Sequence, residues 1–399
     1  QIGIRDYIDL FNNQREKLWQ EESSPRNYPH TVATTWSIAM AKITREQPMA
    51  VDLLNFVSFM APDDIPLDFV LGNKRYKSGR LTVELANRLA AIRTDIDAVR
   101  RIRDQFRYRL LQGKNKLMIY MADYGTNVAK SSNAISVLKN YSLVEGNSES
   151  LSVHNLVQTV TTDKLDATFL KIWMETAIRL INQVYPKAVD DKSNWPMCSR
   201  LLRHALAVSK NAEEKNILPA TNVDLLQKTG KFLYHSAKYT KAEDVQLKAL
   251  DIVKRCYEPT NLKIAEIYRD LGNIYETSDR FEKARENYQN ALKIDKSVYL
   301  EQNPKIAEDL EHLGNVSLKL GNPREALLHY NSAKEYNDIF FVEKHITMAR
   351  SDFNVGRSYL AKGDFENAEA HLENAFKNVR KNYGYDHPFS AEIINQLGD

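Results

Sequence analysis

Few residues of this chain could do covalent or metal chemistry, and the first candidates are a cysteine and a histidine near each other. Cys198 and His204 are six positions apart, close to Trp195. A catalytic cysteine needs a base and a group that orients the base, and a zinc site needs several Cys or His ligands. The segment offers neither set, so we expect both residues to pack in a helical core. With two cysteines there is no disulfide framework, which favours a reducing, cytoplasmic setting.

Two other polar features are also better explained by structure than by catalysis. His154 lies at the end of an expected strand without a carboxylate pair nearby in sequence, so we expect it to cap or pack. An acidic run falls on an expected helix as a solvated or groove-facing stripe, formed by Glu301, Glu308, Asp309 and Glu311. We therefore assign no catalytic residue, no metal and no cofactor, and we expect a protein that is not an enzyme.

Nucleotide binding is not expected of this chain alone. The phosphate-binding motif G-x-x-x-x-G-K-[ST] occurs nowhere in the sequence. The segment from Gly72 to Gly79 contains glycines and basic residues, but it lacks the spacing and the terminal Lys-Ser/Thr of that motif.

The elements that would position a binding surface come from a repeat in the C-terminal half. Glycines recur every 42 residues, and alanines keep the same register 12 and 19 residues after the first four of them. Around the second glycine, apolar residues at helical spacing precede a turn at Thr277–Arg280 and a return helix from Phe281 to Ile294. The pattern predicts stacked helical hairpins whose paired helices approach most closely at the small residues. The repeat glycines are Gly230, Gly272, Gly314, Gly356 and Gly398.

These repeats resemble the tetratricopeptide repeat, on the spacing of a Gly and a Tyr in the first helix and of Phe-x-x-Ala in the second. The 42-residue length, with Asp386-His387-Pro388 ahead of a first helix, is similar to the repeats of kinesin light chains. The resemblance implies an α-solenoid over residues 221–399, with four copies and the start of a fifth. Because the sequence stops inside a first helix, we expect further repeats to follow in the intact protein.

The first helix of each copy is expected to line the concave groove of the solenoid. Side chains three before, one after and four after each glycine would point into that groove. Asn side chains there could hydrogen-bond the backbone of an extended peptide, and Arg side chains could pair with its carboxylates. The alternative is that these side chains only solvate the solenoid. The predicted partner-binding residues are Arg269, Asn273, Asn315, Arg350, Phe353 and Arg357.

The first 220 residues are less periodic and predict a mainly α region with one hairpin. A Gly-Asn turn separates two expected strands, Tyr141–Glu145 and Ser150–His154. Three helices followed by a hairpin is the winged-helix order. Further helices at Trp173–Val184 and Pro196–Lys210 lead into the repeats. The helices expected before the hairpin are Tyr28–Gln47, Met49–Met60, a short one led by Ile65–Leu67, and Ser131–Asn140.

These N-terminal segments resemble NB-ARC regulatory ATPases of the STAND class that end in tetratricopeptide repeats. The resemblance rests on Tyr28-Pro29 with Val32–Trp36, on Ala61–Pro66, on the hairpin with its following helix, and on Asn194-Trp195-Pro196. In such proteins nucleotide state controls assembly and the repeats sense a partner. The implied domains are an N-terminal helical linker at 1–27, a winged-helix-like domain at 28–165 with a basic insert at about 73–130, a helical arm at 166–220, and the repeats at 221–399.

The basic insert is the part that does not fit this family pattern. Residues 73–116 contain thirteen Lys or Arg and four Asp or Glu, on a long helix expected from Thr82 to Leu111. Its simplest interpretation is a solvated helix, and the alternative is a docking surface for an acidic partner. The whole chain has a formal charge of only +3, which argues against a general nucleic-acid or membrane binder. No apolar run approaches the roughly 18 residues of a spanning helix.

Three classes of function follow from the sequence. The favoured one is a non-enzymatic sensor and protein–protein interaction region of an NB-ARC-like signalling protein, with a protein or peptide in the repeat groove. The second is a free-standing repeat scaffold or adaptor. The third, a winged-helix DNA-binding regulator, is weakened because the recognition helix it would use, Ser131–Asn140, carries one Lys and no Arg.

Overall fold

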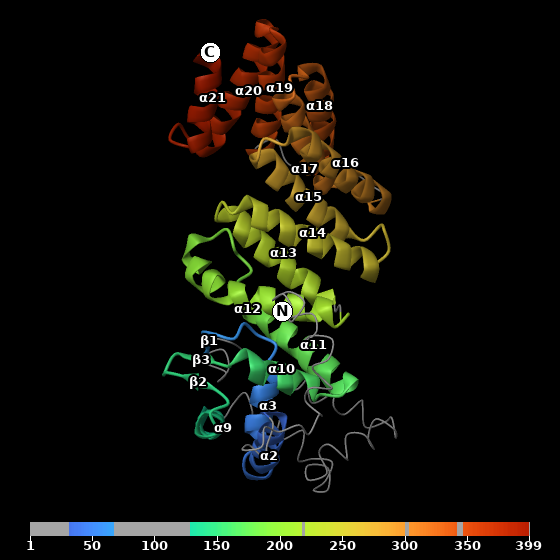
Figure 1. Ribbon diagram of the computed structural model, residues 1–399. Coiled ribbons are helices and arrows are strands. Elements are labelled where there is room, and N and C mark those ends of the chain that lie inside the picture. Colours follow the sequence, from blue (N-terminus) through green and yellow to red (C-terminus); the bar gives the residue numbers. More distant parts are fainter. Residues whose placement is uncertain (1–31, 68–127, 218–219, 300–302, 341–345, 399) are drawn as a thin grey trace, which may run out of the picture. The chain divides into compact units, whose positions relative to one another are not determined.

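Helices dominate the computed structural model, which describes residues 32–67, 128–217, 220–299, 303–340 and 346–398 (Figure 1). The mainly α fold class predicted from the sequence is confirmed. The chain divides into two compact units, Gln1–Leu225 and Leu226–Asp399. The expected linker at 1–27 and the basic insert up to residue 127 lie outside the described residues. Within the described ranges, no helix is both long and apolar enough to cross a membrane.

The N-terminal unit contains two helices at its base, α2 (Val32–Glu46) and α3 (Pro48–Val57). Helix α3 starts with a proline, where the missing N–H costs no hydrogen bond, and it buries nine of its ten residues. The carbonyls at and beyond its C-terminal end are satisfied by a side chain from elsewhere in the unit. Gln158 Nε2 donates to the carbonyls of Val57 and Met60 at 3.2 and 3.1 Å.

A small antiparallel sheet completes this part of the unit. Its strands are β1 (Ile65–Pro66), β2 (Glu145–Gly146) and β3 (Ser150–Ser152), in the order β1-β3-β2, and α9 (Val128–Asn140) precedes β2. In the turn, Asn147 Oδ1 accepts from the N–H groups of residues 149 and 150. The predicted hairpin is confirmed, but its strands are shorter than the expected Tyr141–Glu145 and Ser150–His154. Strand β1 is not predicted, because two residues that include a proline carry no strand pattern.

Three helices follow the hairpin, and the candidate cysteine and histidine are buried on the last of them. Cys198 and His204 are both 0% exposed, and His204 Nε2 lies 3.0 Å from the carbonyl of Asp64. Burial raises the pKa of the Cys198 thiol to about 11, so the reactive thiolate is disfavoured. The packing role expected for this pair is confirmed. The helices are α10 (Asn155–Asp163), α11 (Ala167–Val184) and α12 (Trp195–Glu214).

The residue directly before helix α10 is His154, for which a capping role is predicted. His154 Nδ1 accepts a hydrogen bond from the backbone N–H of Leu156 at 3.2 Å, which satisfies one of the unpaired donors of the first turn. The capping prediction for His154 is confirmed.

The C-terminal helices form a stack of hairpins (Figure 1). The second helix of each pair starts nine residues after the repeat glycine. The alanines 12 and 19 residues after each glycine are at most 2% exposed, as expected of close helix contacts. The pairs are α13 (Ala220–His235) with α14 (Tyr239–Cys256), α15 (Leu262–Thr277) with α16 (Phe281–Val298), α17 (Pro304–Lys319) with α18 (Pro323–Phe340), and α19 (Ile346–Lys362) with α20 (Phe365–Tyr383), followed by α21 (Pro388–Gly398).

Each of the first four repeat glycines lies against the side chain that follows it by sixteen residues on the paired helix. A Cβ added at Gly272 or Gly314 would come within 3.0 Å of the ring of Tyr288 or Tyr330. The corresponding neighbours in the first and fourth copies are the side chains of Gln246 and Leu372. The glycine column therefore exists because a side chain from the second helix occupies the space of the missing Cβ.

The turn between paired helices contains a further column that sequence analysis misses. The residue seven positions after each of the first four glycines has a left-handed backbone conformation, with φ of 58°, 56°, 77° and 80° in the four copies. Glycine tolerates this conformation at no steric cost, whereas other residues are strained in it. The column reads Ala237, Asp279, Gly321 and Gly363, so no shared side-chain chemistry reveals it.

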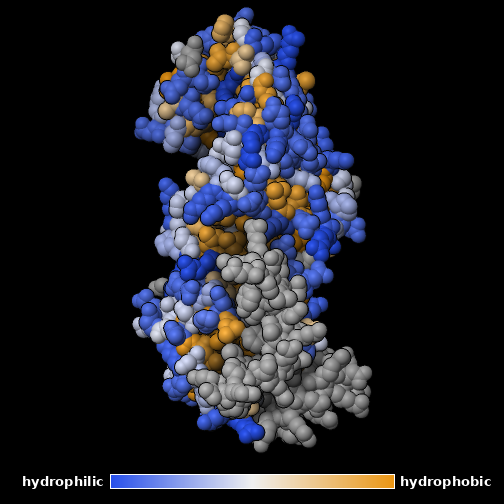
Figure 2. All heavy atoms as spheres, in the orientation of Figure 1, coloured by the Kyte–Doolittle hydropathy of each residue, from blue (hydrophilic) through white to orange (hydrophobic). Residues whose placement is uncertain are grey.

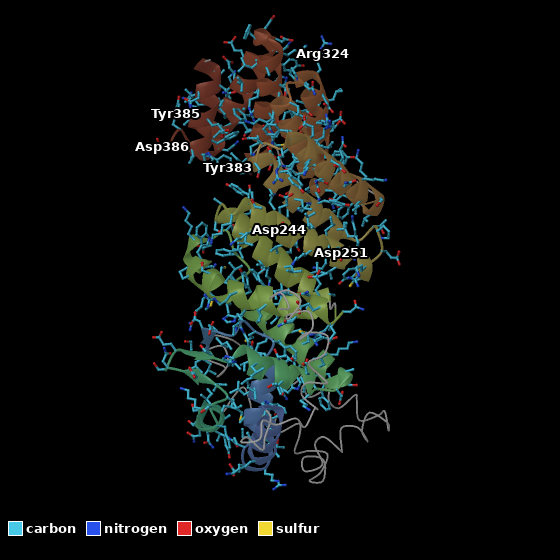
Figure 3. All side chains as sticks on the ribbon, in the orientation of Figure 1. Asp244, Asp251, Arg324, Tyr383, Tyr385 and Asp386 are labelled. Atoms are coloured by element: carbon cyan, nitrogen blue, oxygen red, sulfur yellow. The ribbon has the colours of Figure 1, made fainter. Side chains whose placement is uncertain are left out.

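The last turn explains the motif Asp386-His387-Pro388. Tyr383, Tyr385 and Asp386 mark this turn between α20 and α21 in Figure 3. His387 Nδ1 accepts from the backbone N–H of Phe389 at 3.2 Å, and Pro388 occupies the first position of α21. The motif is therefore a helix start, with the histidine as its cap.

A leucine at Gly272 is expected to destabilise the protein by roughly 1–3 kcal/mol through overpacking against Tyr288. The matched control is Gly398→Leu in the same repeat register, where an added Cβ meets no atom within 4 Å. The control should stay within about 0.5 kcal/mol of wild type. Urea unfolding followed by circular dichroism measures both changes. Equal stability of the two variants would contradict the close-contact explanation of the glycine column.

Candidate partner-binding groove

The first helices of three successive copies line an open cavity of about 380 Å³. Almost every side chain around it is polar or charged. In each of the first two copies, the lining includes the residue three positions before the repeat glycine and the residue directly after it. The lining comprises Gln227, Lys231, Tyr234 and His235 from α13, Gln246 from α14, Glu266, Arg269, Asp270, Asn273 and Ile274 from α15, and Lys305 and Glu308 from α17.

Arg269 is not the exposed groove cation that the sequence predicts. The residue is only 7% exposed, and its Nη1 lies 2.7 Å from Asp295 Oδ2 and 3.1 Å from Asp309 Oδ1. Asp295 comes from α16 of the same copy and Asp309 from α17 of the next, and both are 0% exposed. The exposed position predicted for Arg269 is therefore wrong, because two internal carboxylates hold the guanidinium inside the solenoid.

This ionic cluster contains more negative than positive charge. One guanidinium faces two buried carboxylates. Burial raises the pKa of Asp309 to about 7, and the nearby Asp295 charge adds to this effect against the attraction of Arg269. Burial opposes the charge of Arg269, but the two carboxylates hold its pKa above the ordinary value. The cluster fixes three helices to one another at the wall of the cavity.

The two predicted asparagines are half-buried and already use their acceptor oxygens. Asn273 Oδ1 accepts from the hydroxyl of Tyr288 at 2.7 Å, and Asn315 Oδ1 accepts from the hydroxyl of Tyr330 at 2.6 Å. These are the same tyrosines that pack on the repeat glycines. The amide can offer a ligand its NH₂ donor, and within the described part of the chain no residue accepts from either amide nitrogen.

The predicted residues of the fourth copy separate into a core residue and two surface cations. Phe353 is 3% exposed and packs edge-on against Phe389 with ring centroids 5.1 Å apart, so its predicted groove-facing position is wrong. Arg357 is half-buried, with its guanidinium carbon 5.6 Å from the Phe353 ring centroid. Arg350 is exposed. The visible surface of these last repeats is mostly hydrophilic, with smaller apolar patches (Figure 2).

A stacked aromatic pair beside the groove is not predicted from the sequence. The rings of Tyr288 and His312 are 4.6 Å apart and 9° from parallel, and His312 Nδ1 lies 4.0 Å from Glu276 Oε2. Burial lowers the pKa of His312 to about 4, so the imidazole is neutral near pH 7. No spacing in the sequence signals a contact between these separate helices. Among the described residues, no group of three or more His, Cys, Asp or Glu is placed to hold a metal.

The stacked hairpins with small residues at their contacts define a tetratricopeptide-repeat α-solenoid. The tetratricopeptide repeat family matches residues 225–297, 278–336 and 347–399, so this part of the chain consists of such repeats. A comparison with curated protein sequences gives no match.

Several solved structures match part of this chain. BtubC (BKLC) from P. vanneervenii is 20% identical, covering 55% of this chain and 83% of its own, with a TM-score of 0.44. A putative kinesin light chain from Podosopora anserina is 12% identical, covering 52% and 96%, with a TM-score of 0.45. Aspartyl phosphate phosphatase F from Bacillus subtilis is 12% identical, covering 80% and 78%, with a TM-score of 0.43. At these identities, none of the likenesses assigns an activity to this chain.

Replacing Arg269 by Met should destabilise the protein by about 3–5 kcal/mol, because two buried carboxylates lose the guanidinium partner that they share. Arg350→Met serves as the matched control, since Arg350 is exposed. Its effect should stay within about 0.5 kcal/mol. Urea unfolding of both variants measures the difference, and a small effect of Arg269→Met would show that the cluster does not hold the helices together.

Asp309→Asn should change how stability depends on pH. The pKa of Asp309 is about 7 in the folded protein against an ordinary 3.8, so between these values the folded state binds more protons than the unfolded state. The contribution of Asp309 to the free energy of unfolding therefore falls as pH rises through this window. The Asn variant lacks that loss, so its stability relative to wild type should rise from about pH 4 to about pH 7. Urea titrations across this range test it, and parallel pH profiles would contradict it.

Proposed function

We propose that this chain is the non-enzymatic sensor and interaction region of an NB-ARC/STAND-type signalling protein, whose repeats bind a protein or peptide in the concave groove. The polar cavity between the first helices of three copies carries this proposal. Polar side chains gathered in a hollow are partly desolvated, and a ligand with matching donors and acceptors offsets that cost. A peptide is the ligand class that offers such groups at regular intervals along a groove.

The binding set in this proposal is smaller than the predicted one. Asn273 and Asn315 donate their amide hydrogens to carbonyls of an extended peptide, one in each of two successive copies. Arg350 and Arg357 pair with acidic side chains or a terminal carboxylate further along. Arg269 is excluded as a direct contact because Asp295 and Asp309 already hold its guanidinium, and Phe353 lies against the guanidinium of Arg357.

The N-terminal unit is compatible with a winged-helix-like role in this proposal. The element order α2, α3, β1, α9, β2, β3 and the sheet order β1-β3-β2 support that interpretation. Helices α11 and α12 would serve as the helical arm that transmits partner binding to a nucleotide module outside this chain. Two free cysteines agree with a cytoplasmic location. The basic insert, outside the described residues, would offer a second contact to an acidic partner.

The proposal is tested with peptides selected from a random phage-displayed dodecapeptide library on the full chain. In fluorescence anisotropy, the double variant Asn315→Ala with Arg357→Ala should bind a selected peptide roughly tenfold or more weakly, because charge-assisted hydrogen bonds are lost. Its melting temperature should stay close to that of wild type.

The control is Arg101→Ala with Arg107→Ala on the basic insert, which should bind the selected peptide as wild type does, because the second contact proposed for the insert is to an acidic protein partner and not to a short peptide in the groove. If the insert variant loses binding and the groove variant keeps it, the partner site lies on the insert and the groove assignment is wrong.

A further inference from the structure

We propose that the cavity between α13, α15 and α17 receives a Lys or Arg side chain of the bound peptide, held by Asp270, Glu266 and the side-chain oxygen of Gln246. This inference rests on the proposed peptide-binding function and adds the chemistry of one anchor residue. It differs from the prediction made from the sequence, in which the groove arginines, Arg269 among them, pair with acidic groups of the ligand.

The first observation is an unpaired hydrogen-bond acceptor on the buried side chain of Gln246. The residue is 0% exposed and lines the cavity, and its Nε2 donates to the carbonyl of Gln227 and to Asp270 Oδ2, both at 3.3 Å. Because both of these partners are acceptors, the orientation of the amide is fixed. Its Oε1 is buried and receives no hydrogen bond from any described residue. A buried acceptor without a donor is costly, so the cavity favours a ligand that brings an N–H group.

Asp270 supplies the second acceptor. Its side chain is 12% exposed, its Oδ2 accepts from Gln227 Nε2 at 3.1 Å, and its Oδ1 lies 3.4 Å from Lys231 Nζ. A carboxylate offers about four acceptor positions, so a further donor can be accommodated. Burial raises the pKa of Asp270 to about 6, which shows that the present neighbours do not fully compensate its charge.

The net charge of the side chains that line the cavity decides whether the bound group is a cation or an anion. Two of the cations that line the cavity are already engaged: Lys305 Nζ lies 2.6 Å from Glu308, and Arg269 belongs to the buried cluster. The remaining charges are one cation, Lys231, and two anions, Asp270 and Glu266. Glu266 is exposed and accepts only a long hydrogen bond of 3.5 Å, from Gln227, among the described contacts. An ammonium or guanidinium group would neutralise this excess, and a carboxylate would be repelled.

The size of the cavity fits one long side chain. A volume of about 380 Å³ lies near the lower end of the roughly 300–1,000 Å³ of ligand pockets, too small for a folded element. The stem of Lys or Arg can enter with its apolar part while the charged end reaches the acceptors. A free polyamine has the same chemistry without a peptide backbone, and the experiment separates the two sources.

The experiment uses the random dodecapeptide library on the full chain and reads which residues are enriched. Lys or Arg should dominate one position of the selected peptides. A synthetic peptide with that residue replaced by norleucine should bind wild type roughly tenfold or more weakly, because a charge-assisted contact is lost. The same replacement should weaken binding much less in Glu266→Gln with Gln246→Leu, since the charge of Glu266 and the unpaired amide oxygen are lost and the remaining anion, Asp270, is already paired with Lys231. Leucine is expected to fit at position 246 because Leu372 packs against the repeat glycine at the equivalent position of the fourth copy.

The matched control is Asp244→Asn on α14, an exposed acidic residue labelled in Figure 3 that does not line the cavity. This variant should keep the full preference for the basic peptide. If it loses the preference to the same degree as the cavity variant, the effect is general electrostatics and the cavity assignment is wrong.

The remaining outcomes separate this inference from the proposed function. Selected peptides without a basic residue, which still depend on Asn315 and Arg357, would leave the groove function standing and overturn the cationic anchor. Failure to select any peptide would overturn both. Calorimetry that shows tight binding of spermidine to wild type, with no peptide selected, would assign the cavity to a free polyamine instead.

Discussion

The close approach of two helices at each repeat glycine is the constraint on which the rest of the solenoid depends. Because the glycine has no side chain, the ring of Tyr288 or Tyr330 lies on the backbone of the first helix. Its hydroxyl then reaches the asparagine that follows the glycine, at the edge of the groove. The same contact that packs the hairpin therefore orients an amide toward a ligand, so packing and recognition are set by one side chain.

The first and fourth copies show the same link with different residues. Where the second helix contributes Gln246 or Leu372 instead of tyrosine, the residue after the glycine is Lys231 or Arg357 instead of asparagine. Neither residue has a hydroxyl that an asparagine could use, and each groove position carries a long cation instead. The groove residue that follows the glycine is thus neutral or cationic according to the side chain that packs on the glycine of the same copy.

The sequence predicts the hairpins well because the small residues that mark helix contacts recur in a fixed register. It predicts the groove less well, because burial depends on residues far away in the chain. Arg269 occupies a stripe position that looks exposed, yet its partners Asp295 and Asp309 come from two other helices. Phe353 is covered by Phe389, which belongs to the next copy. Strand β1 has no local signal at all, since pairing with β3 alone defines it.

The buried cluster around Arg269 has a consequence for how the repeat array comes apart. In a linear array each copy contacts only its neighbours, so stability is a sum of terms for single copies and for their boundaries. Separating the second and third copies would break the buried ion pair of Arg269 with Asp309 and leave Arg269 with Asp295 alone, which makes this boundary costly to open. The next boundary is joined by Lys334 and Asp352, whose ion pair is partly exposed and cheaper to break. We therefore expect the second and third copies to unfold as one cooperative unit, with fraying of the array reaching the fourth copy before it divides that pair.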